Sequence, residues 1–297
     1  MTNRFLAQLA TGRVLVADGA TGTNLQKVGL QSGMSPEDWI FDRPDQLVAL
    51  QRAWVDAGSD IILTCTFGGT RLRLKDSPYG DRAPELNRRA VELAQEAART
   101  RPEVLIAGSL GPTGQLFAPF GPLTHDAAVE TYAEQAKALA DGGADLLVIE
   151  THFALDEAGA AIEGAQQACD LPIVISFSFD RGVRTMMGVK PTQVVKAFKP
   201  KGVAAVGANC GTTLENMEKI VQEYAAADSG LIIWAKPNAG LPNVQNGVAT
   251  YDVTPEQMAA SALRNVQAGA RIVGGCCGST PAHLAAIAAA VKNLTSR

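Results

Sequence analysis

The residues of this chain best suited to chemistry are two adjacent cysteines between glycines. The stretch Ile272-Val273-Gly274-Gly275-Cys276-Cys277-Gly278-Ser279 begins as an apolar run typical of a short buried strand. Neighbours on a regular strand point to opposite faces, so Cys276 and Cys277 can share a partner only where the strand pattern breaks, which the glycines permit. Zinc is a natural partner for thiolates. The alternative is that both cysteines are small buried hydrophobic side chains.

Other chemically capable residues also come at or shortly after the ends of apolar runs. Cys210 does so in Gly207-Ala208-Asn209-Cys210-Gly211, as do Asp18, Glu150 and Asn238 elsewhere in the chain. The carboxyl ends of barrel strands meet at one mouth, so a third thiol there can join the cysteine pair. Three protein ligands with a fourth position open are typical of catalytic zinc. The pattern therefore predicts a three-cysteine zinc site.

Strand-like runs alternate with helical patterns along the chain, and the predicted strands would position these residues. We expect eight buried strands over residues 14–18, 60–64, 104–108, 146–150, 173–177, 203–207, 231–235 and 271–274. Residues 126–142 show apolar side chains at helical spacing. Threonines that precede helical runs and glycines that end them before strands support this pattern: Thr124, Thr254, Thr280, Gly58, Gly142 and Gly269.

Eight strand-helix units in 297 residues predict an α/β fold, a (β/α)8 TIM barrel forming a single domain over residues 1–297. A doubly wound open sheet is the alternative, but it would gather distinctive residues at one switch point rather than after nearly every strand. The longest irregular stretches, residues 29–43, 110–123 and 236–253, fall after strands and are expected to line the barrel mouth.

Composition narrows the classes of function. A formal net charge of −4 offers no general basic surface for nucleic acid or anionic membrane, which favours a small-molecule substrate. No apolar window is long enough to span a membrane, and residues 1–7 lack the apolar core of a secretion signal. Five cysteines, an odd number, do not indicate a disulfide framework. We therefore expect a cytoplasmic protein with thiols available to metal.

The sequence resembles the zinc-dependent homocysteine S-methyltransferase family, which includes the homocysteine domain of cobalamin-dependent methionine synthase and betaine-homocysteine methyltransferase. The resemblance covers essentially the whole chain. It is carried by Asp18-Gly19-Ala20-Thr21-Gly22-Thr23, Glu150-Thr151, Gly207-Ala208-Asn209-Cys210-Gly211, Pro237-Asn238-Ala239-Gly240-Leu241-Pro242 and Gly274-Gly275-Cys276-Cys277-Gly278.

The resemblance implies that Cys210, Cys276 and Cys277 bind one zinc ion per chain and that the sulfur of homocysteine completes the tetrahedron. Coordination to zinc deprotonates a thiol that would otherwise be a poor nucleophile. Asn238 is implied to occupy the open zinc position when homocysteine is absent. The alternative for Asn238 is an ordinary turn-forming role.

The resemblance also implies a binding site for the rest of homocysteine. Asp18 and Glu150 would receive its ammonium group, and backbone amides of Gly19, Ala20 and Thr21 would approach its carboxylate. The alternatives are a turn or helix-capping role for Asp18 and an ion pair across the barrel mouth for Glu150.

Some residues depart from this pattern or have no assigned role. Relatives generally show asparagine where this chain has Cys65, which either lies near the methyl donor or packs as a hydrophobic residue. His152 could touch substrate or donor, although a lone histidine does not establish a general base. Cys169 is expected to be structural. The basic run Arg71, Arg73 and Lys75 is expected to be a solvated face.

The expected function is methyl transfer to homocysteine, which forms methionine. The chain ends soon after the eighth helical pattern, so we expect either a stand-alone enzyme using a small sulfonium donor such as S-methylmethionine, or a barrel that meets a separate methyl-corrinoid protein. Two alternatives are a corrinoid-linked methyltransferase acting on a different thiol or methyl substrate, and a non-catalytic zinc- or thiol-binding barrel.

Overall fold

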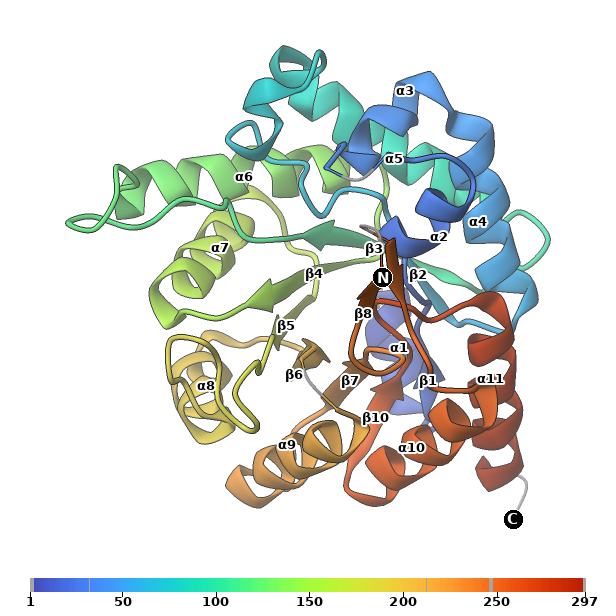
Figure 1. Ribbon diagram of the computed structural model, residues 1–297. Coiled ribbons are helices and arrows are strands. Elements are labelled where there is room, and N and C mark those ends of the chain that lie inside the picture. The colour runs from blue at the N-terminus through green and yellow to red at the C-terminus, as the bar shows by residue number, and fades with distance from the viewer. Residues whose placement is uncertain (1–2, 32, 212, 246–247, 296–297) are drawn as a thin grey trace.

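The computed structural model describes residues 3–31, 33–211, 213–245 and 248–295, and its core is one parallel sheet (Figure 1). The eight strands of this sheet follow the order β1-β10-β7-β6-β5-β4-β3-β2. They are β1 (Leu15–Val16), β2 (Ile61–Leu63), β3 (Leu105–Leu110), β4 (Leu146–His152), β5 (Ile173–Phe177), β6 (Ala205–Cys210), β7 (Ile233–Pro237) and β10 (Ala270–Val273). A bridge between Ala17 and Ile61 joins the first and last strands in this order, so the sheet closes into a (β/α)8 barrel, as predicted.

Helices connect the strands and surround the barrel. They are α1 (Arg4–Ala10), α2 (Gly22–Lys27), α3 (Trp39–Asp42), α4 (Pro44–Asp56), α5 (Ala83–Ala97), α6 (His125–Asp141), α7 (Leu155–Ala168), α8 (Pro191–Phe198), α9 (Leu214–Ala227), α10 (Pro255–Gln267) and α11 (Pro281–Thr295). Short 3-10 turns occupy η1 (Pro36–Asp38), η2 (Arg73–Asp76), η3 (Gly80–Arg82) and η4 (Lys199–Lys201). Among the described residues, no helix is both long and apolar enough to cross a membrane.

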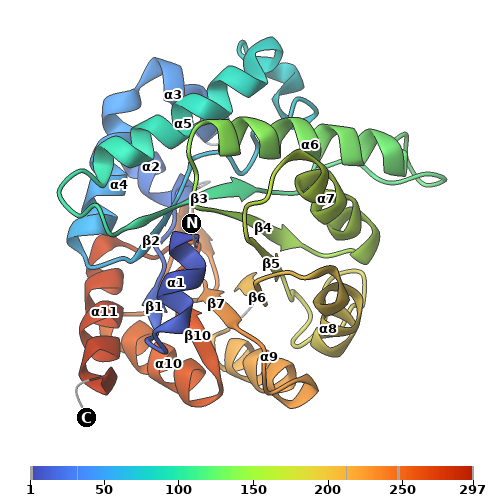
Figure 2. The ribbon, with the colours of Figure 1, turned by 180° about the vertical axis from the view of Figure 1, so that it is seen from behind.

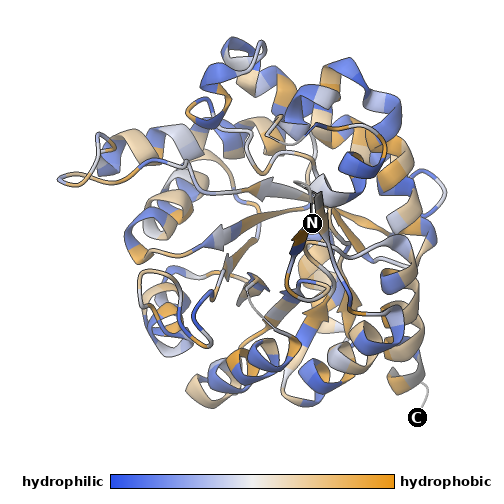
Figure 3. Cartoon of the chain, viewed as in Figure 1, coloured by the Kyte–Doolittle hydropathy of each residue, from blue (hydrophilic) through white to orange (hydrophobic). Residues whose placement is uncertain are grey.

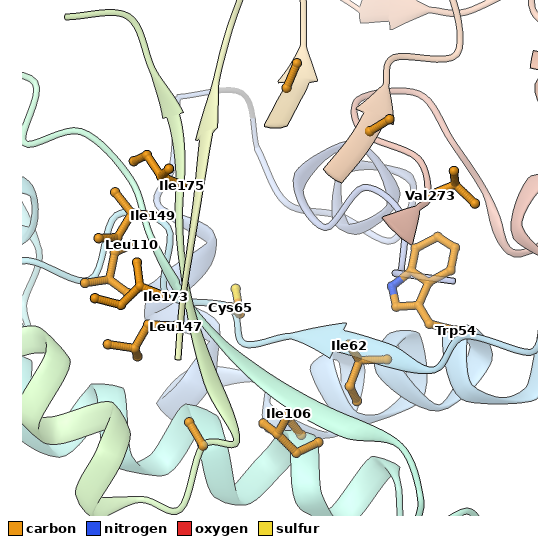
Figure 4. Close-up of a cluster of buried hydrophobic side chains, with 14 of the residues drawn as sticks. Trp54, Ile62, Cys65, Ile106, Leu110, Leu147, Ile149, Ile173, Ile175 and Val273 are labelled. Atoms are coloured by element: carbon orange, nitrogen blue, oxygen red, sulfur yellow. The ribbon is translucent and has the colours of Figure 1, made fainter. Parts of the chain in front are cut away.

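Alternate residues of the strands belong to two separate hydrophobic layers. One layer places Ile62, Ile149 and Ile175 with apolar residues of the surrounding helices (Figure 4). The other contains Leu15, Val148 and further strand residues that point into the barrel. Most helices show hydrophilic residues on the outside of the molecule (Figure 3). Strands buried on both faces explain why their sequences are continuously apolar.

Helix α1 covers the end of the barrel opposite the strand carboxyl ends (Figure 2). Its Phe5 is fully buried and packs with the interior layer of strand side chains. Asn3 caps the helix by accepting hydrogen bonds from the amides of Phe5 and Leu6, at 2.9 and 3.3 Å. No strand-helix pattern predicted this helix, because its packing surface exists only once the barrel has closed.

The predicted local signals agree with these elements. Thr124 and Thr254 cap α6 and α10 through their side chains, and α11 begins directly after Thr280. Two of the expected mouth loops contain regular structure, namely η1 and α3 within 29–43 and a hairpin of β8 (Asn243–Gln245) and β9 (Val248–Thr250) within 236–253. Residues 32 and 246–247 of these loops, and 1–2, 212 and 296–297 of the expected domain, lie outside the described residues.

Candidate active site

A cavity of about 700 Å³ opens at the carboxyl ends of the strands. Its lining combines the cysteine cluster, Glu150 and Lys236 with residues of the loops after β1 and β2, including Gly19, Thr21, Met34, Glu37, Cys65 and Arg73. The predicted loop 29–43 and the predicted strand ends therefore contribute to one concave site, which is where barrel enzymes bind their substrates. Of the other two expected mouth loops, 236–253 contributes only Lys236, which belongs to β7, and no described residue of 110–123 lines this cavity.

The three predicted zinc ligands come together in this cavity. The Sγ atoms of Cys210, Cys276 and Cys277 all lie within 4.8 Å of one another. Cys210 Sγ is 2.8 Å from Cys276 Sγ and 4.0 Å from Cys277 Sγ. All three side chains line the cavity and are partly exposed. The chain therefore gathers three soft ligands around one accessible point.

The turn after β10 is fixed by backbone hydrogen bonds to two neighbouring strand ends. The amide of Gly275 donates to Asp18 O at 3.1 Å, and that of Cys276 donates to Pro237 O at 2.8 Å. A Cβ on Gly274 would lie 2.8 Å from Ala17 O, and one on Gly278, where φ is +80°, would lie 2.1 Å from the Tyr251 ring. Glycine is needed at both positions so that the two thiols can leave the strand pattern together.

Asn209 links the site residues of β4 and β6. Its Oδ1 accepts hydrogen bonds from the Thr151 amide at 3.0 Å and from Ser176 Oγ at 2.6 Å, and its Nδ2 donates to Thr151 Oγ1 at 2.7 Å. Nδ2 also lies 3.6 Å from Cys210 Sγ and 3.9 Å from Cys276 Sγ. The motif around Cys210 contained this residue, but sequence reasoning assigned it no role.

Two non-glycine residues of the site adopt the left-handed backbone conformation. They are Thr151, with φ of 62°, and Cys210, with φ of 54°. Such a conformation costs energy and persists where surrounding contacts impose it. Both residues are direct hydrogen-bonding neighbours of Asn209, which holds the ends of β4 and β6 in this geometry.

The thiols perturb one another's ionisation. Hydrogen bonds from Cys210 and Cys276 lower the pKa of the Cys277 thiol, whereas hydrogen bonding to Cys276 and Cys277, together with burial, raises the pKa of Cys210. One thiol of the cluster therefore loses its proton readily. Further deprotonation is unfavourable, because it would place a second negative charge beside the first. A bound cation would relieve that repulsion.

Asp18 is buried against a lysine that the sequence analysis did not assign. Its Oδ1 lies 2.6 Å from Lys236 Nζ, and its Oδ2 accepts a hydrogen bond from the Leu63 amide at 2.7 Å. Burial lowers the pKa of Lys236, but the charges of Asp18, Glu150 and Cys276 outweigh it, so the net pKa is raised. Lys236 therefore keeps its positive charge. Its signal in the sequence was a charged residue directly after an apolar strand.

Glu150 lines the cavity at the end of β4. Its Oε1 accepts a hydrogen bond from Ser109 Oγ at 2.7 Å. Burial raises the pKa of Glu150 to about 7, an effect that nearby Lys236 partly offsets. Glu150 is thus the predicted carboxylate that faces the cavity, whereas Asp18 does not belong to its lining.

The remaining predicted binding residues take up different positions. Gly19 and Thr21 line the cavity, while the Ala20 amide donates to Ser279 Oγ at 3.1 Å. Asn238 Nδ2 donates to Gly211 O at 3.2 Å, and its Oδ1 is buried without a hydrogen-bond partner in the described structure. A buried amide oxygen beside the Cys210 turn is left available for a ligand.

Cys65, His152 and Cys169 lie in three different environments. Cys65 is buried and lines the cavity, with its Sγ 3.6 Å from Pro36 O (Figure 4). His152 is fully buried beside Tyr132, with ring centroids 6.0 Å apart, and is not part of the cavity lining. Cys169 is half-buried at the end of α7, where the sequence predicted a structural cysteine.

A family profile and two related proteins match this chain over nearly its whole length. The sequence profile of homocysteine S-methyltransferase matches residues 15–291. The methionine synthases of Mycobacterium tuberculosis and Mycobacterium leprae are each 30% identical to this chain, over 97% and 96% of its length. The chain spans 25% of each of those proteins, about a quarter of their length.

Solved structures show the same likeness. The metallated form of the homocysteine methyltransferase MmuM from Escherichia coli is 26% identical, with a TM-score of 0.82 over 97% of this chain and 99% of that one. The apo form of MmuM has a TM-score of 0.76 at 25% identity, over 97% of this chain and 100% of that one. With the family profile matching nearly the whole barrel and its cysteine motifs, the chain belongs to the homocysteine S-methyltransferase family.

Proposed function

We propose that this protein transfers a methyl group to the thiol of homocysteine and forms methionine. The observation that carries the proposal is the convergence of Cys210, Cys276 and Cys277 within 4.8 Å at the cavity. Membership of the homocysteine S-methyltransferase family supports the acceptor and the type of reaction.

The donor set fits one zinc ion per chain. Three thiols satisfy the usual ligand count of a catalytic zinc site and leave one position for substrate. The partnerless buried Oδ1 of Asn238 supports its proposed role as a ligand in the absence of homocysteine. When bound there, zinc would keep the substrate sulfur as a nucleophilic thiolate at neutral pH.

The other residues of the site would bind and orient the amino-acid portion of homocysteine. Glu150 faces the cavity and is proposed to receive the ammonium group. Asp18 contributes its negative charge from outside the cavity lining, where it is paired with Lys236. The backbone around Gly19 and Thr21 would approach the carboxylate end, because both residues line the same cavity. Holding both ends of the substrate would aim its sulfur at the cysteines.

Zinc analysis and zinc-edge X-ray absorption, with and without homocysteine, test this proposal. We expect one zinc per chain with three sulfur ligands, rising to four on addition of homocysteine. Cys276→Ala should lose both zinc and activity, because only two thiols remain. The matched Cys65→Ser variant alters a cysteine of the same cavity outside the cluster and should keep the zinc stoichiometry.

Two results would overturn the proposal. A folded, zinc-free Cys276→Ala protein with full activity would exclude the mechanism. A zinc shell that does not change with homocysteine would favour a different thiol acceptor or a non-catalytic zinc barrel.

For the methyl donor, we propose a separate methyl-corrinoid protein that docks at the cavity mouth. Exposed apolar side chains on loops after β1, β3, β5 and β7 support such a contact: Met34, Phe120, Met187, Leu241 and Val244. Methionine formation from methylcobalamin but not from S-methylmethionine is expected, and the opposite preference would select the small sulfonium donor.

We also propose that the protein works in the cytoplasm, because a reducing compartment keeps its thiols free to bind metal.

A further inference from the structure

The ammonium group of Lys236 lies in the part of the cavity where the sequence analysis expected only the carboxylates of Asp18 and Glu150. Lys236 is the penultimate residue of β7 and lines the same cavity as the cysteine cluster, and its side chain is 3% exposed. Its Nζ is 2.6 Å from Asp18 Oδ1 and 5.5 Å from the ring centroid of the interior Trp234. Lys236 lines the cavity, whereas Asp18 does not. Of this ion pair, the positive partner therefore faces the cavity and the carboxylate does not.

Asp18 holds this lysine in place. Its Oδ1 pairs with Nζ, while its Oδ2 is fixed by the Leu63 amide at the end of β2. A buried ion pair costs desolvation energy, and replacing both partners with uncharged residues is often neutral for stability. Stability alone thus gives little reason for a charged pair here, which directs attention to its position beside the substrate cavity.

The charges that line the cavity beside the cysteines complement an amino-acid thiol. Lys236 supplies a positive group, Glu150 a carboxyl group and the cysteine cluster the point for sulfur. Homocysteine carries a carboxylate, an ammonium group and a thiol. Each of its three groups can meet a partner of matching chemistry, and its ammonium would be repelled from the space occupied by Lys236.

We propose that Lys236, oriented by Asp18, binds the carboxylate of the acceptor thiol and makes this enzyme selective for thiols that carry one. The inference rests on the proposed function and deepens it. Glu150 then receives the substrate ammonium alone, and Asp18 acts through Lys236 rather than by direct contact with substrate.

Calorimetric binding to the zinc-loaded protein, without any methyl donor, tests the proposal with three thiols. These are homocysteine, 4-mercaptobutanoate, which lacks the amino group, and 3-mercaptopropylamine, which lacks the carboxylate. Lys236→Met should weaken the first two by about 10- to 100-fold, as expected for loss of one charge-assisted hydrogen bond, and should not weaken the third, whose ammonium no longer meets a positive charge.

Further variants distinguish a loss of carboxylate binding from a loss of folding. The double variant Lys236→Met with Asp18→Asn removes both charges, so no buried carboxylate is left unpaired, and it should show the same selective loss. Lys236→Arg should restore part of the affinity. Lys75→Met removes a lysine that is exposed on η2 outside the cavity lining and should keep all three affinities.

Equal weakening of all three thiols, or unchanged binding of 4-mercaptobutanoate in the double variant, would overturn the role of Lys236. Failure of the proposed function gives a different result. In that case the wild-type protein binds the carboxylate thiols selectively but forms no methionine with any methyl donor.

Discussion

At the scale of single residues, the site depends on polar groups buried in an apolar barrel. Asn209 satisfies the Thr151 amide and contacts two thiols, and Asp18 neutralises Lys236. Buried polar groups normally need such partners. His152 is an exception, because neither ring nitrogen has a hydrogen-bond partner among the described residues.

His152 predicts a specific pH dependence of stability. Burial lowers its pKa to about 3 in the folded protein. The unfolded chain takes up a proton on this side chain below pH of about 6.5. The unfolded state therefore binds more protons between these values, and stability falls as the pH falls through this window.

His152→Leu should remove this dependence. Between pH 7 and 5, we expect the wild-type protein to lose about 2 kcal/mol more unfolding free energy than the variant. Urea unfolding at both pH values measures the difference. Parallel losses in the two proteins would show that His152 is protonated in the folded state as readily as in the unfolded one.

At the scale of elements, the cysteine pair is placed by the unit α10–β10. Thr254 and Gln257 form reciprocal hydrogen bonds at the start of α10. Thr254 Oγ1 accepts from the Gln257 amide at 3.3 Å, and Gln257 Oε1 accepts from the Thr254 amide at 2.8 Å. Such a capping box fixes where the helix begins. The helix is followed directly by β10 and then by the turn that contains Cys276 and Cys277.

Thr254→Ala should lower the stability of the protein by about 1 kcal/mol, because it removes the side-chain acceptor at the helix start. Thr254→Ser keeps a hydroxyl and should retain most of the wild-type stability. The urea midpoint of each variant provides the measurement. If serine and alanine cost the same, the methyl group of Thr254 matters rather than its hydrogen bond.

At the scale of the whole molecule, closure of the barrel joins the beginning of the chain to β2. The amide of Asp60 donates to Val16 O, while Asp60 Oδ2 accepts from the Val16 amide at 2.9 Å. Arg13 contacts Asp60 Oδ1 at 3.1 Å, and Asp18 bonds to the Leu63 amide further along the same seam. Carboxylate side chains thus complete a seam where, in the described part of the chain, a single bridge joins Ala17, directly after β1, to β2.

Asp60→Ala should weaken this seam. The buried Val16 amide would lose its acceptor, at a cost of about 1–3 kcal/mol. Asp60→Asn keeps an oxygen in place and should cost less. Urea unfolding of both variants tests this order, and equal destabilisation would show that the charge of Asp60, rather than its acceptor oxygen, holds the seam.

Sequence patterns were sufficient to predict the barrel and the meeting of three cysteines at its mouth. All eight expected strands are observed, because buried parallel strands are continuously apolar and their helices show a different period. Cys210, Cys276 and Cys277 stood at strand ends, and closure of a barrel brings all such ends to one mouth. These features depend on local composition and on a general property of the fold.

Contacts across the barrel were decided only by tertiary structure. Lys236 and Asp18 are 218 positions apart, and their pairing requires β7 and β1 to meet the same interior at the right depth. The contact of Asn209 with Thr151 and the burial of Phe5 likewise follow from the register and closure of the sheet. Local patterns alone were enough to assign these side chains to the strand ends. Closure of the barrel decided which of them face the cavity, because strand register sets the depth and direction of every interior side chain.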